Sequence, residues 1–288
     1  MSSLIFIFLL VLVPHVVQGR EIRRNEEIIT FDQNYKVTWG GNHVMYINQG
    51  KEIQLTMDYS SGSGFASKIT YGSGSFHMRI KVPGRDSAGV VTAYYLISQG
   101  NSHDELDFEF LGNREGKPYT LQTNVYANGE GGREQRINLW FDPTTDFHDY
   151  KILWNPHQIV FYVDNIPIRV YKNNSNIGVG YPSKSMQIIA SLWNGENWAT
   201  DGGQSKINWT YAPFKANFQG FDVSGCQSQS LNIDQNCASS SYWWNDKKFW
   251  QLDPNAEKQY ENVKQKYMNY DYCKDRQRYP ILPLECQH

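Results

Sequence analysis

The sequence has no excess of charge of one sign, no long apolar run after its N-terminus and no cysteine in its first three quarters. Its 27 Lys and Arg residues nearly balance its 29 Asp and Glu residues, and no basic stripe forms. This balance argues against nucleic acid as a partner. Without a second long apolar run, the mature chain is not expected to span a membrane. No internal repeat or low-complexity linker occurs either.

The one long apolar run is Leu4–Val13. Its length is typical of an export signal and is too short to cross a bilayer comfortably. Val17 and Gly19 suit cleavage before Arg20, although the run lacks the usual Lys or Arg ahead of it. We therefore expect residues 1–19 to be a signal peptide and the mature protein to be secreted and soluble.

All four cysteines lie in the last quarter of the chain. An even number in an exported chain predicts two disulfides, for which three pairings are possible. We favour Cys226–Cys237 with Cys273–Cys286, because each pair closes a short loop. A zinc site is the alternative, but no C-x-x-C spacing occurs and export favours oxidation. We expect no metal and no cofactor.

Most of residues 25–220 has the pattern of strands, in which short stretches alternate apolar and polar residues and end at Gly, Asn, Asp or Pro. Asp164–Asn165 predicts a hairpin turn. No helical pattern intervenes, which favours an antiparallel sandwich over an α/β fold. The clearest stretches are Ser75–Val82, Val91–Ile97, Tyr150–Trp154, Ile159–Val163 and Met186–Leu192.

The end of the chain differs from the rest. Asp253 followed by Pro254 is a good helix start, because proline suits the first helical position. Apolar residues follow at helical spacing, so we expect a helix that ends at about Met268. The expected organisation is a strand-rich domain over residues 20–220 and a disulfide-linked C-terminal extension over residues 221–288.

The most informative segment is His103–Gly112 (HDELDFEFLG). In a strand, alternate residues share a face, so Glu105, Asp107 and Glu109 would point one way. Leu106, Phe108 and Phe110 would then point into the core. Three like charges along one line are unfavourable for folding, which suggests selection for chemistry.

Two carboxyl groups are what retaining glycoside hydrolysis requires, one as nucleophile and one as general acid/base. We expect Glu105 and Glu109 to be this pair, with Asp107 hydrogen-bonded to Glu105. Mutual repulsion would raise one pKa, so that one carboxyl stays protonated beside an ionised one. The pattern alone does not say which glutamate has which role.

The spacing contains a difficulty, because four residues of strand span ~13 Å whereas a retaining pair requires carboxyl groups ~5–5.5 Å apart. The two side chains would have to lean toward each other. A hard-cation site or a non-catalytic charged face are the alternatives, but the D-x-D-x-D-G loop pattern of calcium sites is absent. His103 is expected to be a structural or subsite residue rather than a metal ligand.

Asp104–Asn113 (DELDFEFLGN) closely resembles the active-site signature of plant xyloglucan endotransglucosylase/hydrolases, in glycoside hydrolase family 16. The resemblance covers nearly the whole mature chain. Its other motifs are Gln122–Val125, Gly132–Gln135, Leu139–Pro143, Ser191–Asn194, Trp198–Thr200 and the four-cysteine tail with Arg278–Pro280.

The family implies an all-β fold, a concanavalin-like β-jelly-roll sandwich with an open groove across its concave sheet, plus the C-terminal extension with its helix. It implies that Glu105 is the nucleophile, Asp107 its assistant and Glu109 the acid/base. Gln122 and Asn124 could instead pair with neighbouring strands, Arg278 could form a salt bridge, and Trp198 could be core. The substrate-binding residues implied are Gln122, Thr123, Asn124, Gly132, Arg133, Glu134, Trp198, Ala199, Gly203 and Arg278.

The sequence departs from the family at Asn113, which many members glycosylate but which is not in a sequon here. Two other sequons begin at Asn173 and Asn208, and the bulky Trp209 makes the second less favourable. The loop between Val125 and Arg136 has ordinary length, whereas the predominantly hydrolytic members of the family extend it.

The expected function is therefore that of a xyloglucan endotransglucosylase of the plant cell wall and apoplast. It would cleave the β-1,4-glucan backbone of a xyloglucan donor and pass the fragment to a xyloglucan or oligosaccharide acceptor, acting as a monomer. The aromatic segments Tyr242–Trp244 and Phe249–Trp250 are candidates for acceptor subsites, although some of these rings would be core. The alternatives are a predominantly hydrolytic enzyme and a wall-binding lectin on the same sandwich.

Overall fold

The structure is a computed structural model that describes residues 28–287, and the expected signal peptide lies outside this range. Within it the chain forms 15 strands that belong to one hydrogen-bonded network. None of the helices described has the length and apolar character needed to cross a membrane. The first elements are α1 (Phe31–Asn34), β1 (Tyr35–Trp39), β2 (Val44–Ile47), β3 (Glu52–Met57), β4 (Ser63–Lys81), β5 (Val90–Ile97), β6 (Glu105–Leu111) and β7 (Thr120–Tyr126). The remaining elements are β8 (Gln135–Asn138), β9 (His148–Trp154), β10 (Gln158–Val163), β11 (Ile166–Lys172), β12 (Met186–Asn194), β13 (Phe214–Gln219), β14 (Ser224–Gln227), α2 (Pro254–Lys266) and β15 (Met268–Asp271).

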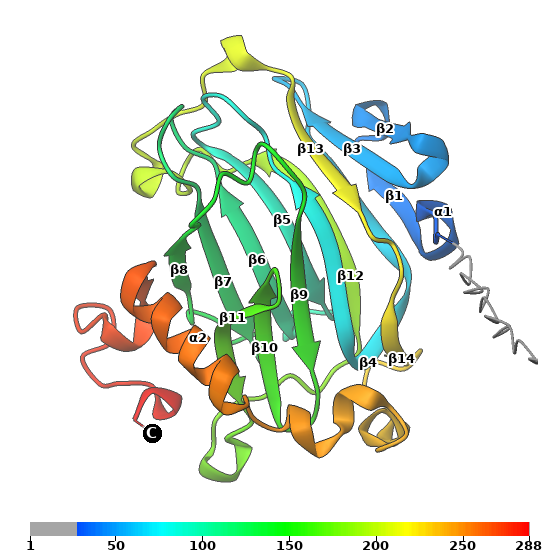
Figure 1. Cartoon of the computed structure of the whole chain (residues 1–288), viewed down its shortest axis with the longest axis vertical. Coiled ribbons are helices and arrows are strands. Elements are labelled where there is room, and N and C mark those ends of the chain that lie inside the picture. The colour runs from blue at the N-terminus through cyan, green and yellow to red at the C-terminus, as the bar shows by residue number, and fades with distance from the viewer. Residues whose placement is uncertain (1–27, 288) are drawn as a thin grey trace, which may run out of the picture.

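The strands form two packed layers, and the long strand β4 belongs to both of them. Its first part pairs with β12, which continues through β5, β6, β7 and β8 to β15. Its second part pairs with β9, which continues to β10 and β11. In Figure 1 the β9–β10–β11 layer lies in front of the β5–β6–β7 layer. The predicted antiparallel sandwich is confirmed.

Aromatic side chains join the two layers. Phe108 of β6 meets Phe161 of β10 edge-on at 5.1 Å between ring centroids. Phe110 meets Tyr150 of β9 edge-on at 4.6 Å. All four side chains are fully buried. Each such pair contributes about 0.5–1.5 kcal/mol beyond its buried area, so β6 is held firmly from its inner side.

The predicted strands and the hairpin turn are confirmed. The five predicted stretches fall within β4, β5, β9, β10 and β12, except that Val82 lies one residue beyond β4. Asp164 and Asn165 link β10 to β11 with φ values of 47° and 65°. Two successive positive φ angles are what a tight two-residue hairpin requires, and Asp and Asn tolerate them.

The C-terminal helix begins as predicted. The side chain of Asp253 accepts hydrogen bonds from the backbone N–H groups of Asn255 and Ala256, which caps α2. The helix ends at Lys266, two residues before the predicted Met268, because Met268 already pairs with Ile137 of β8. The start of β15 therefore sets the end of the helix.

Both predicted disulfides are present. Cys226 bonds Cys237, with Cα atoms 5.4 Å apart, and Cys273 bonds Cys286, with Cα atoms 5.3 Å apart. The extension is also tied to the sandwich, because β14 pairs with β4 and β15 pairs with β8. The predicted division between residues 20–220 and residues 221–288 stays a prediction.

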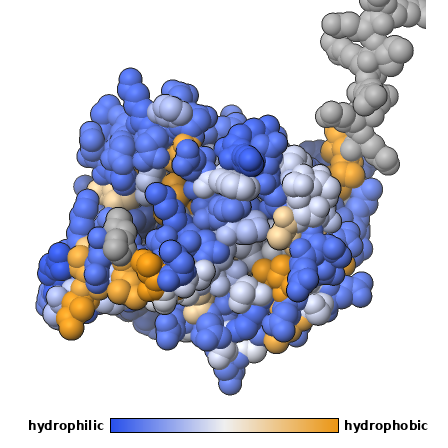
Figure 2. Space-filling view, turned by 90° about the horizontal axis from the view of Figure 1, so that it is seen from below, coloured by the Kyte–Doolittle hydropathy of each residue, from blue (hydrophilic) through white to orange (hydrophobic). Residues whose placement is uncertain are grey.

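The lower end of the molecule is mainly hydrophilic, with separate apolar patches (Figure 2). The extension supplies several exposed apolar side chains, among them Trp243 and Trp250. Trp250 stacks on His157 at 3.9 Å, and the buried Trp244 packs with Leu153 of β9 and Val160 of β10. These tryptophans therefore cover the β9–β10 layer, not the layer that contains β6. The proposal that this aromatic segment extends the acceptor subsites is wrong for that reason.

Candidate active site

The three acidic residues of β6 share one face of the strand. Leu106, Phe108 and Phe110 are fully buried between the layers. Glu105, Asp107 and Glu109 alternate with them and therefore point to the outer face of the layer. We call these three residues the acid row.

The pKa values in the acid row depend on burial and mutual repulsion. Burial, the charges of Glu105 and Glu109 and a hydrogen bond with Glu105 raise the pKa of Asp107 well above its usual range, while Arg169 acts in the opposite sense. Burial also raises the pKa of Glu109, and the charge of Glu105 adds to this. Protons are therefore retained at Asp107 and Glu109, which allows Asp107 to donate a hydrogen bond to the Glu105 carboxylate.

Gln122 and Arg136 form a chain of hydrogen bonds that ends on Glu109. Gln122 lies opposite Glu109 in the pairing of β6 with β7, and its Nε2 donates to Glu109 Oε2 at 2.6 Å. The Nε of Arg136 on β8 donates to Gln122 Oε1 at 2.7 Å. Gln122 and Arg136 both lower the pKa of Glu109, against its burial. The guanidinium of Arg136 lies over the ring of Tyr270 in β15, at 5.3 Å.

His103 contacts the first glutamate of the acid row. Its Nε2 lies 2.9 Å from Glu105 Oε2, and its ring lies 5.2 Å from the ring of Tyr126, which pairs with Glu105 across β6 and β7. This agrees with a structural or subsite role. Among residues 28–287, no group of three or more His, Cys, Asp or Glu side chains is arranged to hold a metal ion.

Tyr95 and Arg136 are site residues that the sequence analysis missed. Tyr95 lies on β5 opposite Asp107. Burial, followed by the charges of Glu105, Asp107 and Glu109, raises the pKa of Tyr95 to about 12. The alternation of apolar and polar residues within each strand could have predicted that both side chains point to the outer face. Their position beside the acid row follows only from the pairing of β5 with β6 and of β7 with β8.

The structure places Thr123 on the wrong face for the predicted substrate contact. It pairs with Phe108, is 2 % exposed and lies on the inner face of β7. Its Oγ1 accepts a hydrogen bond from Arg169 Nη1 at 3.0 Å. Asn124 does share the face of Asp107, but its Oδ1 accepts from the backbone N–H groups of Val125 and Arg133 at 2.9 Å and 3.0 Å.

The predicted substrate contacts of Gly132 and Arg133 are also corrected. Arg133 is 8 % exposed, and its Nε donates to Glu285 Oε1 at 2.6 Å. Its Nη1 donates to the carbonyls of Val125 and Glu130, so this guanidinium is committed inside the protein. The carbonyl of Gly132 accepts from the Tyr279 hydroxyl at 2.6 Å. Both residues therefore attach the C-terminal extension to the β7–β8 loop.

Glu134 and Arg278 bind each other. Arg278 Nη1 donates to Glu134 Oε2 at 2.7 Å, and Nη2 donates to Oε1 at 3.3 Å. The salt-bridge alternative for Arg278 is thus the observed one, although 43 % of its side chain stays exposed. The charge of Glu134 contributes to the raised pKa of Glu109, so the pair lies on the acid-row side of the layer.

Trp198 lies beyond the Glu109 end of the acid row. Leu111, Val91 and Trp193 stand side by side across β6, β5 and β12, and the ring of Trp198 lies 6.0 Å from that of Trp193. Ala199 and Gly203 are buried, and their contact with substrate stays a prediction. Gly203 adopts a φ of +88°, and a Cβ atom there would lie 2.2 Å from the carbonyl oxygen of Asn197. It therefore shapes the turn that holds Trp198.

The two sequon asparagines differ in their hydrogen bonds. Asn173 Nδ2 donates to the carbonyl of Pro156 at 2.8 Å. Asn208 Oδ1 accepts from the N–H and the hydroxyl of Thr210, at 3.2 Å and 2.7 Å. Glycosylation at either residue stays a prediction.

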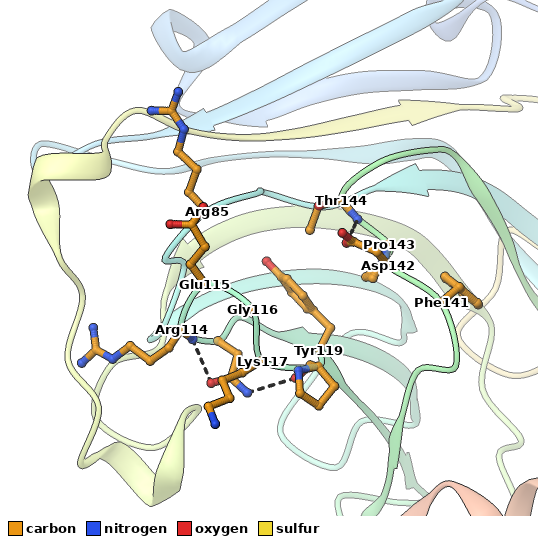
Figure 3. A pocket seen from close by; sticks show the side chains of 12 residues that line it. Arg85, Arg114, Glu115, Gly116, Lys117, Tyr119, Phe141, Asp142, Pro143 and Thr144 are labelled. Atoms are coloured by element: carbon orange, nitrogen blue, oxygen red, sulfur yellow. Dashed lines mark hydrogen bonds between the residues drawn. The ribbon is translucent and has the colours of Figure 1, made fainter.

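Asn113, which is not in a sequon, donates from Nδ2 to the carbonyl of Pro118. It lines a surface pocket of about 340 Å³ that also contains Arg85, Lys117 and Tyr119 (Figure 3). The acid row does not line this pocket.

Comparisons with known proteins identify the family and the fold. Residues 31–211 match the model of glycosyl hydrolases family 16, and residues 238–286 match that of the xyloglucan endo-transglycosylase C-terminus. The chain is 64% identical to xyloglucan endotransglucosylase/hydrolase protein 2 of Arabidopsis thaliana, over 92% of this chain and 91% of that protein. It is 62% identical to the putative xyloglucan endotransglucosylase/hydrolase protein 1 of the same plant, over 90% of this chain and 87% of that one.

Two solved structures show the same fold at low sequence identity. A Bacillus licheniformis beta-glucanase superposes with a TM-score of 0.54 at 23% identity, over 68% of this chain and 92% of the other. The apo Crh5 transglycosylase superposes with a TM-score of 0.55 at 19% identity, over 74% of this chain and 86% of the other. The predicted jelly-roll fold and the resemblance inferred from the motifs are therefore confirmed.

Proposed function

The chain belongs to the xyloglucan endotransglucosylase/hydrolases of glycosyl hydrolase family 16, and from this premise we propose that it is a xyloglucan endotransglucosylase. It cleaves the β-1,4-glucan backbone of a xyloglucan donor with retention and transfers the fragment to another xyloglucan chain or oligosaccharide. The observation that carries the proposal is the acid row, in which two of the three carboxyl groups have raised pKa values.

In the first step, Glu105 attacks the anomeric carbon and Glu109 protonates the departing glycosidic oxygen. The raised pKa of Glu109 keeps that proton available to higher pH than an ordinary glutamate would. The proton retained on Asp107 is shared with Glu105 through their hydrogen bond, which fixes the direction of the attacking oxygen. His103 holds the same carboxylate from its other side.

The second step uses the change of charge that the first step produces. Once Glu105 is an ester, its negative charge no longer contributes to the raised pKa of Glu109. Glu109, now deprotonated, takes the proton of the incoming 4-hydroxyl group, and that oxygen displaces Glu105 from the anomeric carbon. Gln122, held by Arg136, stabilises the Glu109 carboxylate in this state.

Transfer must compete with water, which is present at roughly 55 M, whereas acceptor chain ends are near millimolar. The acceptor route therefore needs about a 10⁴–10⁵ advantage, or roughly 6–7 kcal/mol. Oriented binding can supply this amount. The β8–β15 edge of the layer, with the half-exposed Arg278 paired to Glu134, is the surface on which we place acceptor binding.

The β7–β8 loop supports transfer over hydrolysis. It closes tightly, since Ala127 and Glu130 exchange backbone hydrogen bonds around Asn128 and Gly129. Both turn residues have positive φ values, of 55° and 84°. A compact loop leaves the acceptor side of the acid row open to a polymer. We place the protein in the plant cell wall and apoplast, as a secreted monomer that remodels xyloglucan.

The test is incubation with xyloglucan and a fluorescent xyloglucan oligosaccharide. Label entering the polymer without new reducing ends is the expected result, and steady growth of reducing ends would favour the hydrolase. Glu105→Gln and Glu109→Gln should keep binding and lose turnover. A lectin would bind the polymer equally well with and without these changes and would never incorporate the label.

A further inference from the structure

Arg169 is a buried cation that faces the acid row from behind. It lies on β11, is 1 % exposed and points between the two layers. Its Nη1 donates to the carbonyl and to the hydroxyl of Thr123 on β7, at 2.8 Å and 3.0 Å. Its Nη2 is buried and has no hydrogen-bond partner among the described residues.

No carboxylate neutralises this guanidinium at contact distance. None of the ion pairs within 4.0 Å among residues 28–287 includes Arg169. Burial lowers its pKa, and the groups that act against burial are Tyr272, Tyr260, Tyr171 and Asp271. Burying a charge without a charged partner costs free energy. The presence of Arg169 at this position therefore requires an explanation beyond its immediate contacts.

The acid row lies on the opposite face of the layer that Arg169 contacts through Thr123. Thr123 stands between Gln122 and Asn124, whose side chains face Glu109 and Asp107. The guanidinium therefore lies directly behind the β6–β7 pair, while the acid row lies in front of it. In Figure 1, β11 and β7 belong to the two facing layers. The charge of Arg169 lowers the pKa of Asp107, as the smallest of the effects that act on it, while burial and the charges of Glu105 and Glu109 raise that pKa.

We propose that Arg169 is a positioning residue of the acid row, which fixes the Thr123 peptide and supplies an internal counter-charge that favours ionisation of the Glu105–Asp107 pair. This inference rests on the proposed function of that pair. The residue type fits the role, because a buried guanidinium keeps its proton where a buried lysine readily loses it. A buried charge also acts through a low-dielectric interior, where it is little screened by salt.

The C-terminal extension closes this arrangement. The Arg169 guanidinium lies between the ring of Phe161, at 5.8 Å, and the ring of Tyr272, at 5.9 Å. Tyr272 directly precedes Cys273, which the disulfide to Cys286 anchors. The extension thus excludes water from Arg169, and this exclusion preserves the strength of its field at the acid row.

The test compares Arg169→Met and Arg169→Lys with the control Phe161→Leu, which disturbs the same packing without removing charge. The substrate is a xyloglucan oligosaccharide glycoside with an aryl leaving group of low pKa, whose departure needs no proton from Glu109. The acidic limb of its kcat/KM profile then reports ionisation of the Glu105–Asp107 pair. The charged and titratable groups that face this pair are Glu109, Tyr95 of β5, Tyr126 of β7, His103 and Arg169 itself.

Arg169→Met should move the acidic limb upward by about one pH unit, which is a tenfold loss of kcat/KM on that limb. Arg169→Lys should move it in the same direction, because a buried lysine readily loses its proton, and Phe161→Leu should lower the Tm but leave the limb in place. A folded Arg169→Met protein with the parent limb would overturn the inference. If that variant does not fold, the lysine variant decides in the same way.

Glu105→Gln, measured with the same donor, separates the two proposals. If it is inactive while Arg169→Met keeps the parent profile, only the role of Arg169 is overturned. If Glu105→Gln still turns over this donor, the proposed function itself fails.

Discussion

Gln122 Nε2 lies 2.6 Å from Glu109 Oε2, in a bond that links the acid row to the C-terminal extension. Arg136 donates to the other end of the same amide, at 2.7 Å, and rests on the ring of Tyr270 in β15. An amide held at both ends cannot turn its oxygen toward Glu109 without losing two hydrogen bonds. The extension therefore supports contacts that lower the pKa of Glu109, although it supplies no residue of the acid row.

This geometry predicts the effect of replacing Gln122 with methionine, which keeps the length of the side chain but removes the donor. The hydrogen bond lowers the pKa of Glu109, so its loss should raise that pKa. Glu109 then keeps its proton to higher pH, and the basic limb of kcat/KM with xyloglucan should move upward by about one pH unit. The second step, in which the glycosyl group leaves Glu105, should slow because the Glu109 carboxylate is less stabilised. An exposed change in the extension, Gln251→Met, is the control and should leave the limb unchanged.

A second prediction concerns the Glu134–Arg278 pair. Arg278→Met removes the exposed guanidinium from the β8–β15 edge. The substitution also leaves the Glu134 carboxylate, whose charge acts on Glu109, without its partner. We expect the ratio of label incorporation to new reducing ends to fall about tenfold, because the acceptor is bound less well while water is unaffected. Arg276→Met, an exposed cation in the same segment, is the matched control. An unchanged ratio would show that acceptor binding does not use this edge.

The acid row itself was predictable, because alternation along one strand needs only the local sequence. The residues from other strands were not. Tyr95 and Arg136 face the acid row because of how β5 pairs with β6 and β7 pairs with β8. The register of these pairings cannot be derived from the local sequence. Thr123 is a different case. The same alternation rule that places the three acids on one face places Thr123 on the opposite face from Gln122 and Asn124. The prediction that Thr123 binds substrate followed the family motif instead of this rule.

The misassigned Arg133 shows another limit of local patterns. Its partner Glu285 lies 152 residues away, in the disulfide-linked tail. A local motif that predicts an exposed arginine cannot show that a distant segment of the chain covers that side chain. The two disulfides, in contrast, were predictable because each closes a short local loop.

The Arg133–Glu285 pair supports a third prediction. Both side chains are about nine-tenths buried, so removing one charge leaves the other without a partner. Glu285→Gln should lower the free energy of unfolding by roughly 3 kcal/mol. Urea unfolding measures this, with the exposed Glu257→Gln on α2 as control, for which a change below about 0.5 kcal/mol is expected. Equal midpoints for the two variants would contradict the prediction.

A fourth prediction concerns stability at alkaline pH and His77 on β4. Its Nδ1 lies 2.8 Å from Asp149 on β9, and its Nε2 lies 3.1 Å from Asp222, which precedes β14. Hydrogen bonds to Asp149 and Asp222 raise the pKa of His77 to about 9 from its usual value near 6.5, against partial burial. The imidazolium thus joins two carboxylates from two segments of the chain.

A raised pKa in the folded state means that the folded protein binds the proton more tightly than the unfolded chain. The resulting stability is fully present below pH 6.5 and is lost as the pH rises through 9. After allowance for solvent screening, we expect it to be on the order of 2 kcal/mol. The free energy of unfolding of the parent should therefore decline between these two pH values. His77→Gln should be less stable at pH 6 and should show a flatter profile, so that the two proteins converge near pH 10. Parallel profiles across this range would show that the two aspartates do not hold His77 in its charged form.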